Sequence, residues 1–184
     1  MTNNYTINEF SIGIHPQKYS TTVSFIASSV DKFCNELIQW GKEIGCFYKS
    51  HKIDGKQWST FLGDFSGQET KALVLPTRSQ WCVFTLNDLI GGIPTSTLSS
   101  IAQRLKTQCV GITYDDQIVA KEQNRPFGLV FEYYNGEVSP VYKRIIYLSK
   151  DYGKWDFAQE GKPLPFENVE SYLAKRNQNV SQKK

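Results

Sequence analysis

The chain has 184 residues and a formal net charge of +3. This length is typical of one domain and allows a hydrophobic core that needs no disulfide or metal to stabilise it. So small a positive charge does not indicate a nucleic-acid-binding surface, and no run of about 20 apolar residues predicts a membrane-spanning helix. Aromatic residues make up 14% of the chain, which favours a β-rich core.

The cysteine and histidine content argues against a metal site and against a secreted disulfide framework. No two cysteines form a C-x-x-C pair, and only His15 and His51 could add imidazole ligands. The first residues also lack the basic and apolar regions of a signal peptide. We therefore expect a cytoplasmic protein without metal or cofactor. Reduced, buried thiols are expected at Cys34, Cys46, Cys82 and Cys109.

Hydrophobic periodicity predicts two helices and five strands in the first two thirds of the chain. The helices are predicted over residues 29–44 and 95–106. The strands are predicted over residues 10–14, 21–27, 71–76, 80–86 and 109–114. Residues 47–67 are ambiguous, because their aromatic residues and two glycines fit either one helical turn with a loop or two short strands.

The first predicted helix has clear signals at both ends. Ser29 can accept hydrogen bonds from the first turn, and Asp31 favours the positive end of the helix dipole. Gly45 provides a residue that readily adopts the left-handed conformation often found after a helix. Lys32 and Glu36 lie one turn apart on the polar side, where they can form an ion pair.

The last third of the chain predicts a three-stranded meander followed by a helix. Strands are predicted over residues 127–134, 141–149 and 154–157, a helix over 167–176, and a disordered polar tail over 177–184. Asn135-Gly136 is a strong hairpin signal between the first two of these strands. The sequence thus predicts a single α+β domain over residues 1–176. In it a mostly antiparallel sheet, including the C-terminal meander, is packed by two main helices and a short C-terminal helix.

No catalytic constellation is recognisable in the sequence. His15 and His51 lie in polar surroundings typical of surface histidines, whereas the cysteines on apolar faces are typical of core packing. Gly91-Gly92-Ile93-Pro94 precedes a helix but lacks the motif of a phosphate-binding loop, and its proline removes a backbone donor. We therefore expect a binding protein and not an enzyme.

The candidate partner contacts are aromatic and acidic residues. Tyr133 and Tyr134 are neighbours on one strand and must face opposite sides, so one is buried and the other can anchor a partner. Trp58, with Asp64 nearby, is a further candidate because exposed tryptophans are frequent at interfaces. The acidic candidates for contact with a basic partner are Asp115, Asp116 and Glu122.

The segment Gly153–Arg176, with the sequence GKWDFAQEGKPLPFENVESYLAKR, resembles the ending of a family of small bacterial immunity proteins of toxin systems, including contact-dependent growth inhibition. In this segment Trp155 and Phe157 are expected on one side of a strand. Gly161 allows a turn, two prolines rigidify the corner that follows, and Phe166 can staple the start of the last helix.

The resemblance implies a protein that binds a cognate toxin, such as a nuclease, and neutralises it by covering its active or substrate-binding surface. It implies no catalysis, no cofactor and no membrane partner. The alternative is a nucleic-acid or small-ligand module, in which aromatic residues of an open sheet face stack on bases with help from Lys143, Arg144 and Lys154. The low net charge disfavours nucleic acid. The sequence leaves the oligomeric state open.

Overall fold

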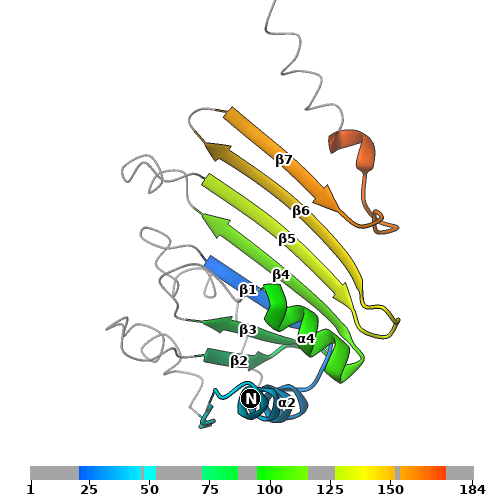
Figure 1. The fold of residues 1–184 in the computed structure, drawn as a ribbon. Helices are drawn as coiled ribbons and strands as arrows, with labels where there is room; N and C mark the ends of the chain where they lie inside the picture. Colours follow the sequence, from blue (N-terminus) through cyan, green and yellow to red (C-terminus); the bar gives the residue numbers. More distant parts are fainter. Residues whose placement is uncertain are drawn as a thin grey trace, which may run out of the picture.

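The computed structural model describes residues 21–46, 48–52, 72–86, 95–115, 127–151 and 154–172. Within them, seven strands form one antiparallel sheet in the order β2-β3-β1-β4-β5-β6-β7, with two helices packed on it (Figure 1). In chain order the elements are β1 (Thr21–Ile26), α2 (Val30–Glu43), β2 (Ala72–Pro76), β3 (Cys82–Leu86), α4 (Thr95–Leu105), β4 (Gln108–Asp115), β5 (Phe127–Asn135), β6 (Tyr142–Asp151) and β7 (Lys154–Glu160). The α+β class and the β5-β6-β7 meander confirm the predicted fold class.

Both helices lie on the same face of the sheet (Figure 1). α4 packs against β4 and β5, whereas α2 packs against β2 and against α4. β6 and β7 extend beyond α4, so neither α2 nor α4 covers these two strands. The two halves of the sheet therefore have different surroundings, which matters for the candidate site.

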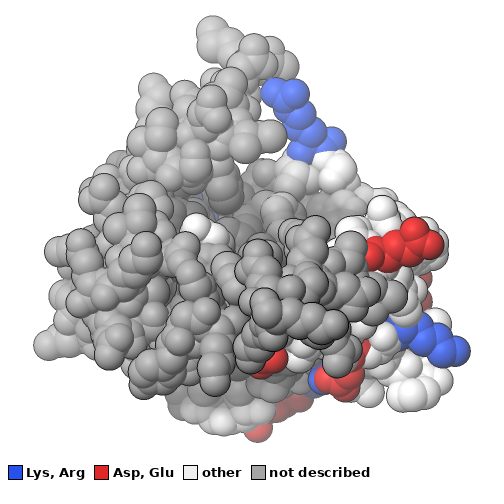
Figure 2. All heavy atoms as spheres, turned by 90° about the horizontal axis from the view of Figure 1, so that it is seen from above, with Lys and Arg blue, Asp and Glu red and all other residues white. Residues whose placement is uncertain are grey.

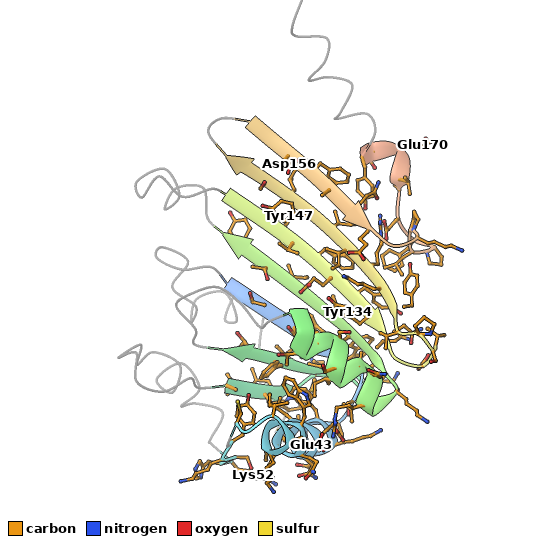
Figure 3. The ribbon with its side chains drawn as sticks, viewed as in Figure 1. Glu43, Lys52, Tyr134, Tyr147, Asp156 and Glu170 are labelled. Carbon is orange, nitrogen blue, oxygen red and sulfur yellow. The ribbon has the colours of Figure 1, made fainter. Side chains whose placement is uncertain are left out.

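The main core lies between the two helices and the first half of the sheet. Phe33 of α2 and Phe84 of β3 meet edge to face, with ring centroids 5.1 Å apart. In Figure 3 the side chains are crowded between the helices and the sheet. The buried cluster consists of Ile26, Phe33, Leu37, Cys82, Phe84, Leu98, Ile101, Ala102, Leu105, Cys109 and Tyr134.

α2 begins and ends as predicted. The Ser29 side chain accepts a hydrogen bond from the Lys32 backbone N–H at 3.3 Å, and Asp31 lies in the first turn. Gly45 follows the helix with a φ of +78°, in the left-handed region that glycine adopts at low cost. The buried positions recur every fourth residue, at Phe33, Leu37 and Gly41.

The two helices are joined by a charged cluster on their exposed sides. Glu36, which the sequence predicted to pair with Lys32, is hydrogen-bonded to Arg104 of α4. Arg104 also donates two hydrogen bonds to Glu43, at 2.7 Å and 3.0 Å. Arg104 lies 68 positions after Glu36 and 61 positions after Glu43. Helical spacing within α2 could therefore not predict this pairing.

The β5–β6 hairpin is present, but its turn differs from the tight one that Asn-Gly favours. The pairing ends at Asn135 opposite Tyr142, which leaves a six-residue loop between them. Gly136 is not among the described residues with positive φ. Instead, a Cβ atom at this position would lie 1.7 Å from the Ala102 carbonyl oxygen, so glycine is needed for close approach to α4.

The C-terminal segment is only partly as predicted. β7 continues to Glu160, and the described part of the predicted last helix is helical at residues 169–172. The prediction that Phe166 staples this helix is wrong, because its side chain is 79% exposed. Leu164 is the buried apolar residue of this corner.

Several predictions lie outside the described residues. These are the strand over 10–14, most of the ambiguous segment 47–67 and the tail over 177–184. Residues 48–52 are described and form neither helix nor strand. Among the helices that the structure describes, none is both long and apolar enough to cross a membrane.

Candidate functional site

Apolar side chains cross the second half of the sheet in two rows. Strand register places Ile112, Phe131 and Ile146 in one row, and Tyr114, Leu129, Leu148 and Phe157 in the other. Cys109 of β4 and Tyr134 of β5 face the helices, and side chains alternate along a strand. Both rows therefore lie on the face opposite α2 and α4. We call these seven residues the apolar sheet face.

The apolar sheet face is incompletely covered. Ile112, Leu129 and Phe157 keep 39%, 37% and 37% of their surface exposed, although each comes from a long, regularly paired strand. Contiguous exposed apolar area of this kind is uncommon on a monomeric protein and often marks an interaction site. The sheet holds these side chains in fixed register, so the surface needs little ordering to meet a partner.

A buried ion pair borders this surface. Arg144 of β6 is fully buried beside Tyr133, and its Nε and Nη2 donate to the Glu167 carboxylate at 2.9 Å and 2.6 Å. Nη1 donates to the Gly161 carbonyl at 3.1 Å, and Nη2 to the Gln159 side chain at 2.8 Å. Glu167 in turn accepts from the Leu164 backbone N–H at 2.8 Å. We call these contacts the C-terminal latch.

The latch keeps both of its charged groups ionised. Hydrogen bonds from Arg144 hold the pKa of the Glu167 carboxyl below its ordinary value of 4.5. The same bonds raise the pKa of Arg144. Farther along the segment, the Tyr172 ring contacts that of Phe157 at a centroid distance of 5.6 Å. The latch thereby places residues 161–172 against one border of the apolar sheet face.

The latch occupies one of the three basic residues that the nucleic-acid alternative names, and the side chain of another, Lys154, lies outside those described. Arg144, which was expected on an open sheet face, is buried and bound to Glu167. Lys143 forms an ion pair with Glu160 at 3.0 Å. Among the described residues on the face shown in Figure 2, positive and negative side chains lie apart and form no continuous patch of one sign. The described side chains therefore offer no row of cations for a phosphate backbone.

The predicted partner contacts are only partly described. Tyr134 is 1% exposed and donates a hydrogen bond to Glu132 at 3.1 Å, so it belongs to the core and presents no surface to a partner. Tyr133 faces the opposite side and is partly buried against Tyr142. One tyrosine therefore faces inward, as the sequence predicted. The candidates that lie outside the described side chains are Trp58, Asp64, Asp115, Asp116 and Glu122, of which Asp115 ends β4.

The described cysteines and His51 differ in burial. Burial raises the pKa of the Cys82 thiol to about 11 and that of Cys109 to about 12, which makes both poor nucleophiles. The prediction that all four thiols are buried is wrong for Cys46, which is exposed beyond the end of α2, and Cys34 is only partly buried. His51 is exposed, as expected of a surface histidine. Within the described residues, no group of acidic, cysteine or histidine side chains could hold a metal ion.

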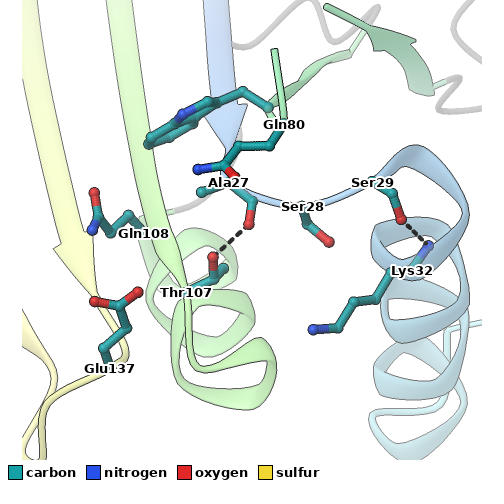
Figure 4. Close-up of a pocket in the computed structure, with 9 residues that line it drawn as sticks. Ala27, Ser28, Ser29, Lys32, Gln80, Thr107, Gln108 and Glu137 are labelled. Atoms are coloured by element: carbon teal, nitrogen blue, oxygen red, sulfur yellow. Dashed lines mark hydrogen bonds between the residues drawn. The ribbon is translucent and has the colours of Figure 1, made fainter.

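A polar pocket of about 390 Å³ lies where the ends of β1, β3 and β4 meet the beginning of α2 (Figure 4). It is lined by Ala27, Ser28, Ser29, Lys32, Gln80, Trp81, Thr107, Gln108 and Glu137. The sequence did not indicate this site, because its lining residues come from four separate segments. Ser28 and Ser29, the two consecutive serines before α2, were the available signal, but serines at this position are equally typical of helix capping alone.

In comparisons of the chain with protein-family models, with curated proteins and with solved structures, no match was found. The resemblance of the C-terminal segment to immunity proteins therefore stays a prediction. The apolar sheet face, the C-terminal latch and the polar pocket are the features of the described residues that bear on function.

Proposed function

We propose that this protein is an immunity protein that binds a cognate bacterial toxin and blocks the toxin's active or substrate-binding surface, without catalysis of its own. The apolar sheet face is the observation that carries the proposal. Ile112, Leu129 and Phe157 are exposed on regular strands, and a protein partner would remove their apolar surface from water.

The apolar sheet face is large enough to inhibit a toxin by covering its active or substrate-binding surface. A stable protein–protein interface buries roughly 800 Å² on each partner, an area that a face spanning four strands can provide. The apolar centre would supply most of the affinity, and the tyrosines near its border, including Tyr133, would supply hydrogen bonds as well as contact area. Such a complex excludes substrate by occupying space, so it needs no catalytic residue in this chain.

A toxicity-rescue assay tests the proposal. The gene next to the one that encodes this chain in its native host is expressed alone and together with the full chain, and cell growth is measured. We expect the neighbouring product to stop growth alone and the full chain to restore it. The purified pair should also form a complex of fixed stoichiometry.

Two matched variants locate the interface. Leu129→Asp places a charge in the apolar sheet face and should weaken the complex by tenfold or more, because a buried unpaired charge is costly. Val138→Asp makes the same chemical change at a 47% exposed residue of the β5–β6 loop and should leave the affinity unchanged. Equal affinity of Leu129→Asp and the unsubstituted chain, with both folded, would remove this face as the interface.

A further inference from the structure

The polar pocket has a positive side built by the beginning of α2. Ser28, Ser29 and Lys32 lie together on one side of it (Figure 4). The first N–H groups of a helix lack partners within the helix and point away from it, which favours an anionic group at this position. The Ser29 side chain accepts from the Lys32 N–H, so it satisfies one of these donors. Asp31, also in the first turn, is exposed and does not line the pocket.

A second observation on this side points independently to a ligand. Among the buried side-chain atoms of the described residues, only Ser24 Oγ and Ser28 Oγ lack a hydrogen-bond partner. Ser28 is 8% exposed, lines the pocket, and directs its hydroxyl into the same space as the Lys32 side chain (Figure 4). Buried hydroxyls without a partner are rare, and a ligand oxygen in this space would supply one.

The other side of the pocket has the opposite charge. Glu137, from the β5–β6 loop, lies across the pocket from Lys32, and Gln108 lies on the same side as Glu137 (Figure 4). Gln80 adds a further amide, which can both donate and accept hydrogen bonds. A simple anion would meet the Glu137 carboxylate, whereas a ligand with charges of both signs would match both sides.

Hydrogen bonds between its segments hold the pocket in shape. The Thr107 hydroxyl donates to the Ala27 carbonyl at 2.6 Å, and the Ala27 N–H donates to the Gln108 carbonyl at 2.9 Å. The Gly136 N–H donates to the Thr107 carbonyl at 2.8 Å, which fixes the loop that carries Glu137. Because these bonds lie entirely within the protein, the pocket needs little ordering when a ligand enters it.

We infer that this pocket binds a small zwitterion of the α-amino-acid type. The ligand carboxylate lies at the beginning of α2, where it accepts from the Ser28 hydroxyl and meets the charge of Lys32. The ligand ammonium group faces Glu137. The volume of about 390 Å³ is within the range of small-molecule sites and is sufficient for a free amino acid. This inference does not depend on the proposed toxin partner.

Titration calorimetry on the full chain tests the inference. The probes are the twenty L-amino acids, and any that binds is repeated as its N-acetyl derivative and as its carboxamide. We expect one or a few amino acids to bind, and both derivatives to bind at least tenfold more weakly, since each lacks one charge. Equal binding of the N-acetyl derivative would overturn the zwitterion, and no binding by any amino acid would overturn the site.

Two serine variants separate the pocket from general effects on folding. Ser28→Ala removes the unpartnered hydroxyl and should weaken binding about tenfold while leaving the unfolding transition unchanged or higher. Ser24→Ala removes the other unpartnered hydroxyl, which is fully buried in β1 and does not line the pocket, so it should leave binding unchanged. Unchanged affinity in Ser28→Ala would overturn the assigned ligand position.

Discussion

At the scale of single residues, Arg144 and Glu167 depend on each other because both are removed from water. Arg144 uses Glu167, Gln159 and two backbone carbonyls as acceptors, so its charge is compensated only while the C-terminal segment stays in place. Breaking a buried ion pair by changing one partner leaves the other charge uncompensated. The latch therefore couples the position of residues 161–172 to the stability of β6.

Glu167→Gln tests the latch. This substitution should lower the free energy of unfolding by about 3 kcal/mol, because it leaves the buried Arg144 guanidinium without an anionic partner. Glu160→Gln is the matched control, since its carboxylate pairs with Lys143 and both side chains are exposed. The control should change stability by less than about 1 kcal/mol in urea unfolding. Equal effects of the two substitutions would contradict the latch.

The latch also predicts a direction for the pH dependence. Because Arg144 lowers the pKa of Glu167 in the folded state, the pair contributes its full stability above the ordinary carboxyl pKa of 4.5 that applies to the unfolded chain. This contribution is lost as the pH falls through the lower, folded-state pKa. The stability difference between the unsubstituted chain and Glu167→Gln should therefore shrink in acid. A difference that stays constant from neutral to acidic pH would count against this assignment.

Two glycines should respond differently to the same substitution. Gly136→Ala forces a Cβ atom to within 1.7 Å of the Ala102 carbonyl oxygen, so the β5–β6 loop or α4 must move. Gly45→Ala meets no atom within 4 Å, and its cost comes only from the φ of +78°, about 1 kcal/mol. Thermal unfolding should show the larger loss for Gly136→Ala. A smaller loss of thermal stability in Gly136→Ala than in Gly45→Ala would mean that the β5–β6 loop can move away from α4 at little cost.

At the scale of the elements, α4 connects the parts of the fold. It packs on β4 and β5 and also contacts α2. Its Arg104 donates hydrogen bonds to Glu36 and Glu43 of α2. The charged cluster is exposed and sensitive to salt, whereas the apolar stripe of α4 faces the core. Packing of this stripe, more than the ion pairs, should fix α4 on the sheet.

Ile101→Ala tests the contribution of α4 packing. Ile101 is fully buried, so its truncation should cost about 2–5 kcal/mol through lost apolar burial and the cavity left behind. Ile44→Ala, at a 51% exposed position after α2, is the matched control and should cost much less. Denaturant unfolding measures the loss of unfolding free energy in both variants. Similar losses would show that the core rearranges to fill the cavity left at Ile101.

At the scale of the whole molecule, the sheet is wider than the helices that pack on it. α2 and α4 pack on one face of the sheet, against β2, β4 and β5, whereas the apolar sheet face lies on the opposite side of β4–β7 and keeps much of its surface in water. This imbalance between strands and covering helices is the feature that an interaction with another molecule would resolve.

The exposed apolar surface can be measured without a partner. Ile112→Lys combined with Leu129→Lys should reduce the fluorescence of a hydrophobic dye bound to the native protein, because both side chains are more than a third exposed. The unfolding temperature should change little. Val138→Lys, in the β5–β6 loop, should leave dye binding nearly unchanged. Undiminished fluorescence in the double variant would show that the dye binds elsewhere.

The sequence by itself determined the local elements that the structure describes. The cap at Ser29, the end of α2 at Gly45 and the alternating strands of the meander depend on neighbours in sequence, and these predictions are confirmed. The buried state of Cys82 and Cys109 also followed from their apolar surroundings. Short-range geometry and periodicity are properties of the chain itself, so they can be recognised before the fold is known.

Only the tertiary structure decided how distant segments meet. The pairing of Arg144 with Glu167, the close approach of Gly136 to α4 and the polar pocket each join residues far apart in sequence. Register and helix placement also decide which apolar strand residues stay exposed, since alternation assigns two faces without saying which one is covered. These features depend on long-range contacts, which local sequence patterns do not encode.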